Sequence, residues 1–180
     1  TTLACGVSTS PSARKNRQNT SPNGFPSALN FAAVWKAPCV FVCVDNGWAI
    51  SVPSKEQSAQ PEFVKKARAY GMPGFEVDGN DVLACYELMH WLVVHARSGA
   101  GPALLVVKTY RMLGHSSSDD PTRYRDKAEV ELWEKRDPIR RYARFLERRG
   151  VLRTGELDQL ETGLYAEIDR IVHDQEVAPP

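Results

Sequence analysis

The pattern of apolar positions along the chain alternates between two kinds of segment. Continuous apolar runs lie at 40–44, which is rich in β-branched residues, and at 103–107, and the segment Phe-Glu-Val at 75–77 is typical of a short strand. Such runs are typical of strands buried on both faces of a parallel sheet. Apolar residues recur every three or four positions at 62–70 and 82–96, which predicts amphipathic helices. Strands that alternate with helices in this way predict right-handed βαβ units, and hence an α/β fold with a parallel sheet flanked by helices.

The two ends of the chain follow other patterns. Residues 1–22 are rich in Ser, Thr, Asn and Arg with little apolar periodicity, so a divergent and poorly ordered leader is expected there. From 126 to 180 the pattern is helical, and an aliphatic stripe between 157 and 172 is typical of helix packing. The sequence therefore predicts three segments, a leader, an α/β domain at 23–125 and a helical C-terminal extension at 126–180.

Composition and charge exclude several classes of function. The 180 residues are 42% hydrophobic, which is typical of a globular domain with its own core. Because 23 basic and 22 acidic residues leave a net charge of +1, neither nucleic acid nor a membrane surface is an expected partner. No apolar stretch approaches the roughly 20 residues that a membrane-spanning helix needs. The four cysteines lack C-x-x-C spacing, which predicts buried, reduced thiols and no zinc site.

The first candidate site follows the strand at 40–44. The strand ends at Asp45-Asn46-Gly47, and ligands of open α/β sheets collect at the carboxyl ends of the strands. Oxygen donors on a tight loop suit a hard cation such as Mg²⁺, held together with waters and a substrate phosphate. The same three residues are also typical of a simple turn, and they do not by themselves distinguish the two interpretations.

The second candidate site is the long segment from 111 to 125. It holds His115, three serines, two aspartates and the arginines Arg111, Arg123 and Arg125. Long segments without regular structure are often functional, and arginines next to a histidine suit a phosphate oxyanion. A solvated polar loop remains an equal alternative on composition alone.

Several motifs taken together resemble the alpha subunit of the thiamine-diphosphate-dependent 2-oxo acid dehydrogenases. They lie at 28–38, 45–53, 77–81, 110–111, 114–116, 118–120 and 124–125. The matching motifs occur in the same order from about residue 23 to residue 180. The chain is therefore similar to the C-terminal portion of such a subunit. The forms Asn-Gly-Trp-Ala-Ile-Ser and Ser-Asp-Asp resemble the branched-chain type more than the pyruvate type.

The resemblance implies a partial thiamine-diphosphate-binding fold and an oxidative decarboxylation. The implied partners are a dehydrogenase beta subunit in a heterotetramer, a lipoyl acyltransferase that receives the acyl group, and a small 2-oxo acid substrate. The implied cofactors are thiamine diphosphate and Mg²⁺, of which the first carries the chemistry. A cytoplasmic location is expected if the source is bacterial, and the mitochondrial matrix if it is eukaryotic.

The resemblance also implies roles for particular residues. Asn46 would bind Mg²⁺ through its side-chain oxygen and Trp48 through its backbone carbonyl. Arg111 and His115 would bind the cofactor at its diphosphate. His115, which would also lie beside the substrate channel, would be the catalytic residue that supports acylation of the lipoyl arm. Ser116 falls where kinase-regulated relatives are phosphorylated, and a phosphate there would repel the diphosphate.

The chain departs from the family pattern in two places. Asp45 stands where asparagine is usual, a change that spares Asn46. About 29 residues upstream of Asn46, a Gly-Asp-Gly or Gly-Glu-Gly triplet is expected, and its acidic residue is the first Mg²⁺ ligand. This chain has Asn-Arg-Gln at 16–18, and the guanidinium of Arg17 cannot ligate a cation. The alternative hypothesis is therefore a truncated, non-catalytic paralogue or fragment that only binds a beta subunit.

Overall fold

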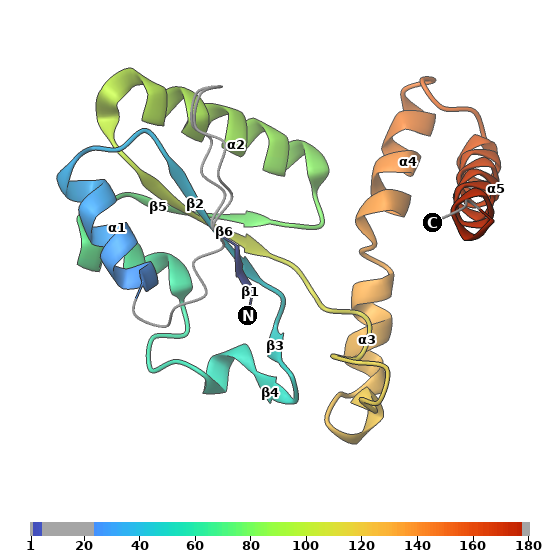
Figure 1. The fold of residues 1–180 in the computed structure, drawn as a ribbon, viewed down its shortest axis with the longest axis horizontal. Helices are drawn as coiled ribbons and strands as arrows, with labels where there is room; N and C mark the ends of the chain where they lie inside the picture. Colours follow the sequence, from blue (N-terminus) through green and yellow to red (C-terminus); the bar gives the residue numbers. More distant parts are fainter. Residues whose placement is uncertain (1, 5–23, 178–180) are drawn as a thin grey trace. The chain divides into compact units, whose positions relative to one another are not determined.

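The computed structural model describes residues 2–4 and 24–177. The chain divides into two compact units, Thr1–Pro138 and Ile139–Pro180, and each unit is described by itself. Figure 1 shows the fold.

The first unit alternates strands and helices. Its strands are β1 (Thr2–Ala4), β2 (Val40–Asp45), β3 (Trp48–Ala49), β4 (Val52–Pro53), β5 (Gly74–Asp78) and β6 (Ala103–Lys108). Its α-helices are α1 (Gly24–Val34), α2 (Val82–His95) and α3 (Lys127–Glu134). Its shorter helical turns are η1 (Ser54–Glu56), η2 (Phe63–Tyr70), η3 (Ala96–Ala100) and η4 (Pro121–Arg123). The second unit contains most of α4 (Pro138–Arg148) and all of α5 (Glu156–Glu176).

The main sheet has the strand order β1-β2-β6-β5. Strands β2 and β5 both pair in parallel with β6, which confirms the predicted parallel sheet. The register places Asp45 opposite Lys108 and Asp78 opposite the same lysine. The carboxyl ends of three strands therefore meet at one edge, where the sequence predicts the site. The smaller β3–β4 hairpin follows directly after β2.

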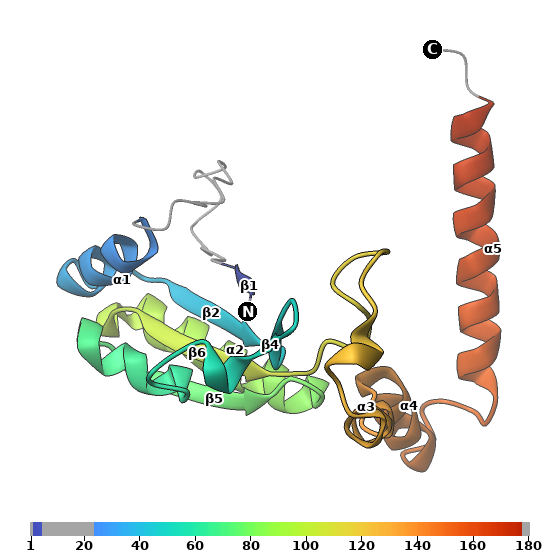
Figure 2. The same cartoon turned by 90° about the horizontal axis from the view of Figure 1, so that it is seen from below.

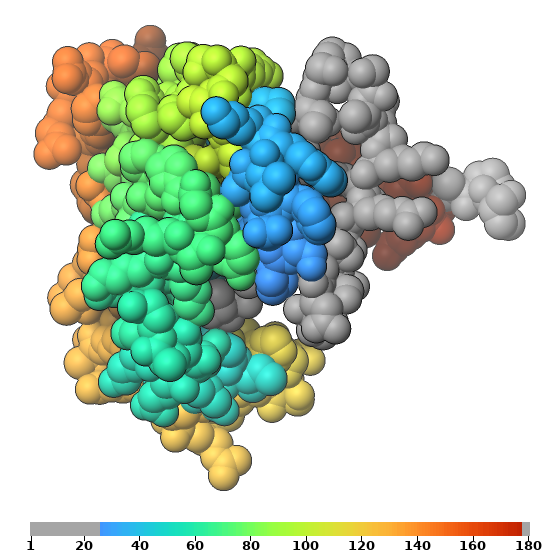
Figure 3. Space-filling view, turned by 90° about the vertical axis from the view of Figure 1, so that its left-hand side faces the viewer, coloured from blue at the N-terminus to red at the C-terminus, as the bar shows by residue number. Residues whose placement is uncertain are grey.

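Helices cover both faces of the sheet (Figures 1 and 2). On one face, α1 and η2 lie side by side and pack Leu29, Phe63 and Ala67 against alternate residues of β2 and β6 (Figure 3). On the other face, α2 packs Leu92 against the opposite residues of the same strands, such as Leu105. Both faces of the central strands are thus buried, which explains their continuous apolar sequence.

Side-chain caps fix where two of the helices begin. The Asp81 carboxylate accepts a hydrogen bond from the Ala84 N–H at 3.0 Å at the start of α2. The Asp126 carboxylate accepts one from the Ala128 N–H at 2.9 Å at the start of α3. Each cap satisfies a backbone donor that the first helical turn leaves unpaired. The α3 helix then stays with the first unit, because Trp133 stacks on Tyr110 with ring centroids 5.2 Å apart.

The structure departs from the sequence expectations in three details. Residues 2–4, inside the segment expected to be poorly ordered, form β1, because their backbone pairs antiparallel with the edge of β2. Residue 1 and residues 5–22 lie outside the described residues. The segment predicted as a helix at 62–70 is the 3₁₀ helix η2, which ends at Gly71 in the left-handed conformation.

The third departure concerns α5. Its aliphatic stripe was expected to pack, yet no residue of α5 is buried, and Leu164 is 58% exposed. Within the second unit, ion pairs from Arg140 on α4 to Asp158 and Glu161 join the two helices. Among the described residues, no helix has the length and apolar character needed to cross a membrane.

Candidate functional site

The edge of the sheet is held by an ion pair between neighbouring strands, in which the carboxylate is buried and the lysine is partly exposed. The Lys108 ammonium at the end of β6 lies 2.7 Å from Asp45 Oδ2 at the end of β2. The other Asp45 oxygen accepts hydrogen bonds from Ser54 Oγ at 2.7 Å and from the Gly47 N–H at 3.2 Å. The Asp45 carboxylate is therefore engaged within the protein on both of its oxygens.

The ion pair shifts the pKa values of both partners. Burial acts to raise the pKa of Asp45, but the hydrogen bonds from Lys108, Ser54 and Gly47 lower the pKa more, so the net shift is downward. Burial acts to lower the pKa of Lys108, but the bonded carboxylate raises it by more. Both shifts favour the charged forms, as expected for a paired, hydrogen-bonded group.

The Asn46 loop and the start of the 111–125 segment are joined through their backbones. The Thr109 N–H donates to the Asp45 carbonyl at 2.9 Å, and the Arg111 N–H donates to the Asn46 carbonyl at 3.0 Å. These bonds continue the β2–β6 ladder beyond the ends of both strands. Two of the three predicted cofactor-binding residues, Asn46 and Arg111, are consequently neighbours at one edge.

Within its loop, Asn46 makes a local turn. Its Oδ1 accepts a hydrogen bond from the Trp48 N–H at 3.2 Å, and the Gly47 carbonyl accepts one from the Ser54 N–H at 2.8 Å. Gly47 has a φ of +82°, a conformation that glycine adopts without steric cost. The turn directs the chain into the β3–β4 hairpin, and the Trp48 ring is buried.

The Arg111 side chain is partly engaged. Its Nη2 donates to the Ile50 carbonyl at 2.6 Å and to Tyr124 Oη at 3.1 Å. Its Nε donates to the Leu113 carbonyl at 3.3 Å. No hydrogen bond of Nη1 to a described residue is observed, so this end of the guanidinium can bind a phosphate oxygen.

A second arginine, Arg125, anchors the base of the long loop. Its guanidinium is buried and donates to the carbonyls of Arg111 at 2.6 Å, Met112 at 3.1 Å and Leu113 at 3.0 Å. The rings of Trp48, Tyr110 and Tyr124 lie 5.5 to 5.6 Å from it, within range of cation–π attraction. Arg125 is thus a structural centre of the site, whereas the sequence suggests only that it could bind an anion.

The tip of the loop is organised by the half-buried carboxylate of Asp119. Asp119 Oδ2 accepts hydrogen bonds from the His115 N–H at 2.7 Å and from Tyr124 Oη at 2.5 Å. These two bonds lower the pKa of Asp119. The His115 and Ser116 side chains are exposed, and the hydroxyls of Ser116 and Ser118 lie 3.1 Å apart. His115 therefore has a fixed backbone and an accessible imidazole.

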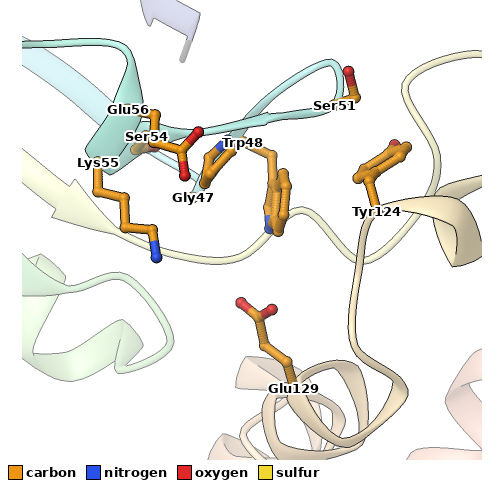
Figure 4. Close-up of a pocket in the computed structure, with 9 residues that line it drawn as sticks. Gly47, Trp48, Ser51, Ser54, Lys55, Glu56, Tyr124 and Glu129 are labelled. Carbon is orange, nitrogen blue, oxygen red and sulfur yellow. The ribbon is translucent and has the colours of Figure 1, made fainter.

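A pocket of about 540 Å³ opens beside the hairpin (Figure 4). The Trp48 ring lines the cavity between Lys55 and Tyr124, and the Glu129 side chain faces it from α3. The remaining lining residues include Gly47, Ser51 and Ser54. The pocket thus begins at the loop that carries the predicted metal ligands.

The donors at this edge fit a magnesium diphosphate in part. An amide oxygen at Asn46 and a backbone carbonyl at Trp48 are hard oxygen ligands, and Mg²⁺ completes its shell with waters and phosphate oxygens. Asp45 is unsuited to this role because its carboxylate is bound to Lys108. Among the residues that the structure describes, no group of three or more His, Cys, Asp or Glu side chains gathers for a metal ion. The triplet at 16–18 lies outside the described residues.

Several residues of this site were not predicted from sequence as functional. Lys108 and Ser54 hold Asp45, and Glu129 faces the pocket from α3. The Asp45–Lys108 pair could have been predicted from the sequence. Each residue is the first charged position after a buried apolar run, and neighbouring parallel strands end at the same edge of the sheet. The burial of Arg125 depends on three rings from separate segments and has no comparable local signal.

The fold and the edge site define the class of open α/β proteins whose candidate site lies at the carboxyl ends of parallel strands. The sequence profile of the dehydrogenase E1 component matches residues 20–180, and the chain belongs to this family.

Curated relatives agree with this assignment. A Mycobacterium tuberculosis protein named 3-methyl-2-oxobutanoate dehydrogenase subunit alpha is 51% identical over 132 residues, which is 73% of this chain and 36% of the relative. The Arabidopsis thaliana mitochondrial 2-oxoisovalerate dehydrogenase subunit alpha 2 is 46% identical over 73% of this chain and 28% of its own. The Porphyra purpurea pyruvate dehydrogenase E1 component subunit alpha is 39% identical over 85% of this chain and 44% of its own. The chain therefore spans less than half the length of these relatives.

Proposed function

We propose that this chain is an alpha subunit, or part of one, of a 2-oxo acid dehydrogenase that acts with thiamine diphosphate and Mg²⁺. The observation that carries the proposal is the hydrogen bond from the Arg111 N–H to the Asn46 carbonyl at 3.0 Å. It supports the proposal because it brings an arginine and an asparagine to one edge of a parallel sheet, where they could bind a phosphate and a cation. The 51% identity to a protein named for a branched-chain 2-oxo acid favours that substrate class over pyruvate.

In this proposal the chain supplies binding and orientation. Asn46, through its side-chain oxygen, and Trp48, through its carbonyl, would hold Mg²⁺, and Arg111 would hold a diphosphate oxygen. Thiamine diphosphate, when bound, supplies the electron sink that decarboxylation of a 2-oxo acid requires. The fixed backbone of His115 would present an accessible imidazole in support of acyl transfer to the lipoyl arm.

The partners follow from the same proposal. A dehydrogenase beta subunit would complete the cofactor site, and a lipoyl acyltransferase would receive the acyl group. Ser116 is a candidate for regulatory phosphorylation, because its hydroxyl is exposed on the loop that carries His115. A phosphate there would add about −1.5 to −2 charges beside the diphosphate site and oppose cofactor binding.

The test is reconstitution of the chain with a dehydrogenase beta subunit. With Mg²⁺, thiamine diphosphate and a lipoylated acceptor, we expect release of CO₂ from 3-methyl-2-oxobutanoate with a higher kcat/KM than from pyruvate. Arg111→Ala should weaken cofactor binding most, whereas His115→Ala should weaken it less and chiefly slow acyl transfer. Equal loss in both variants would contradict the separate roles given to these residues.

A second candidate function rests on Arg17, which stands where the family has an acidic metal ligand. In that case the chain binds a beta subunit without catalysis. Stable co-purification with the beta subunit and no CO₂ release from either 2-oxo acid at saturating cofactor would favour this second function. Restoring the acidic ligand with Arg17→Asp should then recover Mg²⁺-dependent cofactor binding.

A further inference from the structure

The pairing of Asp45 with Lys108 affects which oxygens of the loop at 45–48 can reach the proposed cation. Asp45 stands next to Asn46, and a carboxylate binds a hard divalent cation more strongly than an amide does. A free carboxylate at this position would compete with Asn46 for the ion. The structure shows this carboxylate buried and turned to the strand end instead.

Three donors hold the carboxylate there. Lys108 Nζ at 2.7 Å binds one oxygen, while Ser54 Oγ at 2.7 Å and the Gly47 N–H at 3.2 Å bind the other. Only Lys108 among them carries charge, so it provides most of the compensation for burying an anion. A weaker contact of Lys108 with Glu76 at 3.9 Å lies on the solvent side.

We infer that Lys108 is a positioning residue that keeps Asp45 out of the cation site and thereby leaves Asn46 and the Trp48 carbonyl as the oxygens offered at the edge of the sheet. The inference rests on the proposed function, because that function assigns the cation to these two oxygens. It also accounts for Asp45 at a position where the family usually has asparagine. The acidic side chain is tolerated because a lysine occupies the facing register position on β6.

The experiment uses the whole chain and needs neither the beta subunit nor thiamine diphosphate. Four proteins are compared. They are the unchanged chain, the single variant Lys108→Met, the double variant Asp45→Asn/Lys108→Met, and the control Lys127→Met, which removes an exposed lysine of α3. The measurements are the melting temperature and the affinity for Mn²⁺, followed by electron paramagnetic resonance of the free ion.

Lys108→Met leaves an unpaired carboxylate, so its melting temperature should fall by about 5 °C. The released Asp45 should then bind Mn²⁺ at least about tenfold more tightly than in the unchanged chain. The double variant should recover most of the melting temperature and lose the added Mn²⁺ affinity, because it removes the anion together with its counterion. Lys127→Met should match the unchanged chain in both measurements.

Unchanged Mn²⁺ affinity in Lys108→Met, or the same increase in the double variant, would overturn the inference. A fall in melting temperature that the double variant does not reverse would also overturn it, because Lys108 would then act through packing alone. Absence of 2-oxo acid decarboxylation in the reconstituted protein would refute the proposed function, yet it would leave these two measurements unaffected. The two failures are therefore distinguishable.

Discussion

The two segments that meet at the edge of the sheet are held in different ways. The segment after β2 is fixed by its own buried carboxylate, since Asp45 binds Lys108 and Ser54. The 111–125 segment is fixed only at its base, by the buried guanidinium of Arg125, while its tip relies on exposed contacts around Asp119. Buried polar contacts are costly to break because the partner left behind stays desolvated.

The comparison shows that the segment after β2 is rigidly held, whereas the tip of the 111–125 segment is accessible to solvent. Under the proposed function the segment after β2 would offer oxygens to Mg²⁺, and fixed oxygens suit the strict coordination geometry of that ion. The loop tip that carries His115 and Ser116 stays exposed, and loops of this kind are drawn from the less stable parts of a fold. Substitutions in the buried part should therefore affect stability far more than substitutions at the tip.

The largest effect is expected from Arg125→Met. The variant leaves the carbonyls of Arg111, Met112 and Leu113 without their buried donor and removes the cation from between three rings. We expect the free energy of unfolding to fall by about 3 kcal/mol. Denaturant unfolding followed by fluorescence measures it. Arg123→Met is the matched control, because Arg123 is exposed. A similar loss of stability in both variants would show that the buried guanidinium of Arg125 does not hold the base of the loop.

A smaller loss is expected from Ser54→Ala. The substitution removes one of the donors to the buried Asp45 carboxylate, bonded at 2.7 Å, and should lower the free energy of unfolding by about 1.5 kcal/mol. Ser58→Ala provides the comparison, since the Ser58 hydroxyl is half-buried and donates to the Gln60 carbonyl in an exposed turn. Its effect should stay within about 0.5 kcal/mol in the same denaturant titration. Equal losses would show that the buried carboxylate does not stabilise this segment.

The sequence predicts one of these two segments better than the other. The parallel sheet, its strand ends and the neighbouring positions of Asn46 and Arg111 follow from the apolar runs, because hydrophobic burial dictates both the strands and their alignment. The role of Arg125 cannot be read in this way, since burial of its guanidinium requires rings contributed by Trp48, Tyr110 and Tyr124 from three places in the chain. The exposed stripe of α5 escapes prediction for a similar reason, because periodicity shows an apolar face without showing what covers it.

The order of the loop tip should depend on pH through Asp119. The hydrogen bonds from the His115 N–H and Tyr124 Oη lower the pKa of Asp119 in the folded protein. Their contribution is therefore fully present above the unfolded-state value near 3.8 and is lost as the pH falls through the lower folded-state pKa. Protease cleavage within 113–120 should accelerate at this acidic end, measured with an acid-stable protease.

The control for this pH effect is Asp119→Asn, which keeps an acceptor oxygen but cannot titrate. Its cleavage rate within 113–120 should be higher than that of the unchanged chain at neutral pH and should vary less on acidification. Acid opening of the same size in Asp119→Asn would mean that another carboxylate governs the loop. Asp45, whose folded-state pKa is also lowered, would then be the next residue to replace.

The smallest effect on stability is expected from Ser116→Glu. The Ser116 side chain is exposed and contacts only the Ser118 hydroxyl among the contacts described, so the free energy of unfolding should change by less than about 0.5 kcal/mol. Binding of thiamine diphosphate to the chain assembled with a beta subunit should nevertheless weaken, because the new anion repels the diphosphate. Calorimetric titration measures the affinity, and Ser116→Ala separates the charge from the loss of the hydroxyl. Weakened binding that is equal in the two variants would assign the effect to the hydroxyl, whereas a large loss of stability in Ser116→Glu would show that the tip is as tightly held as the base.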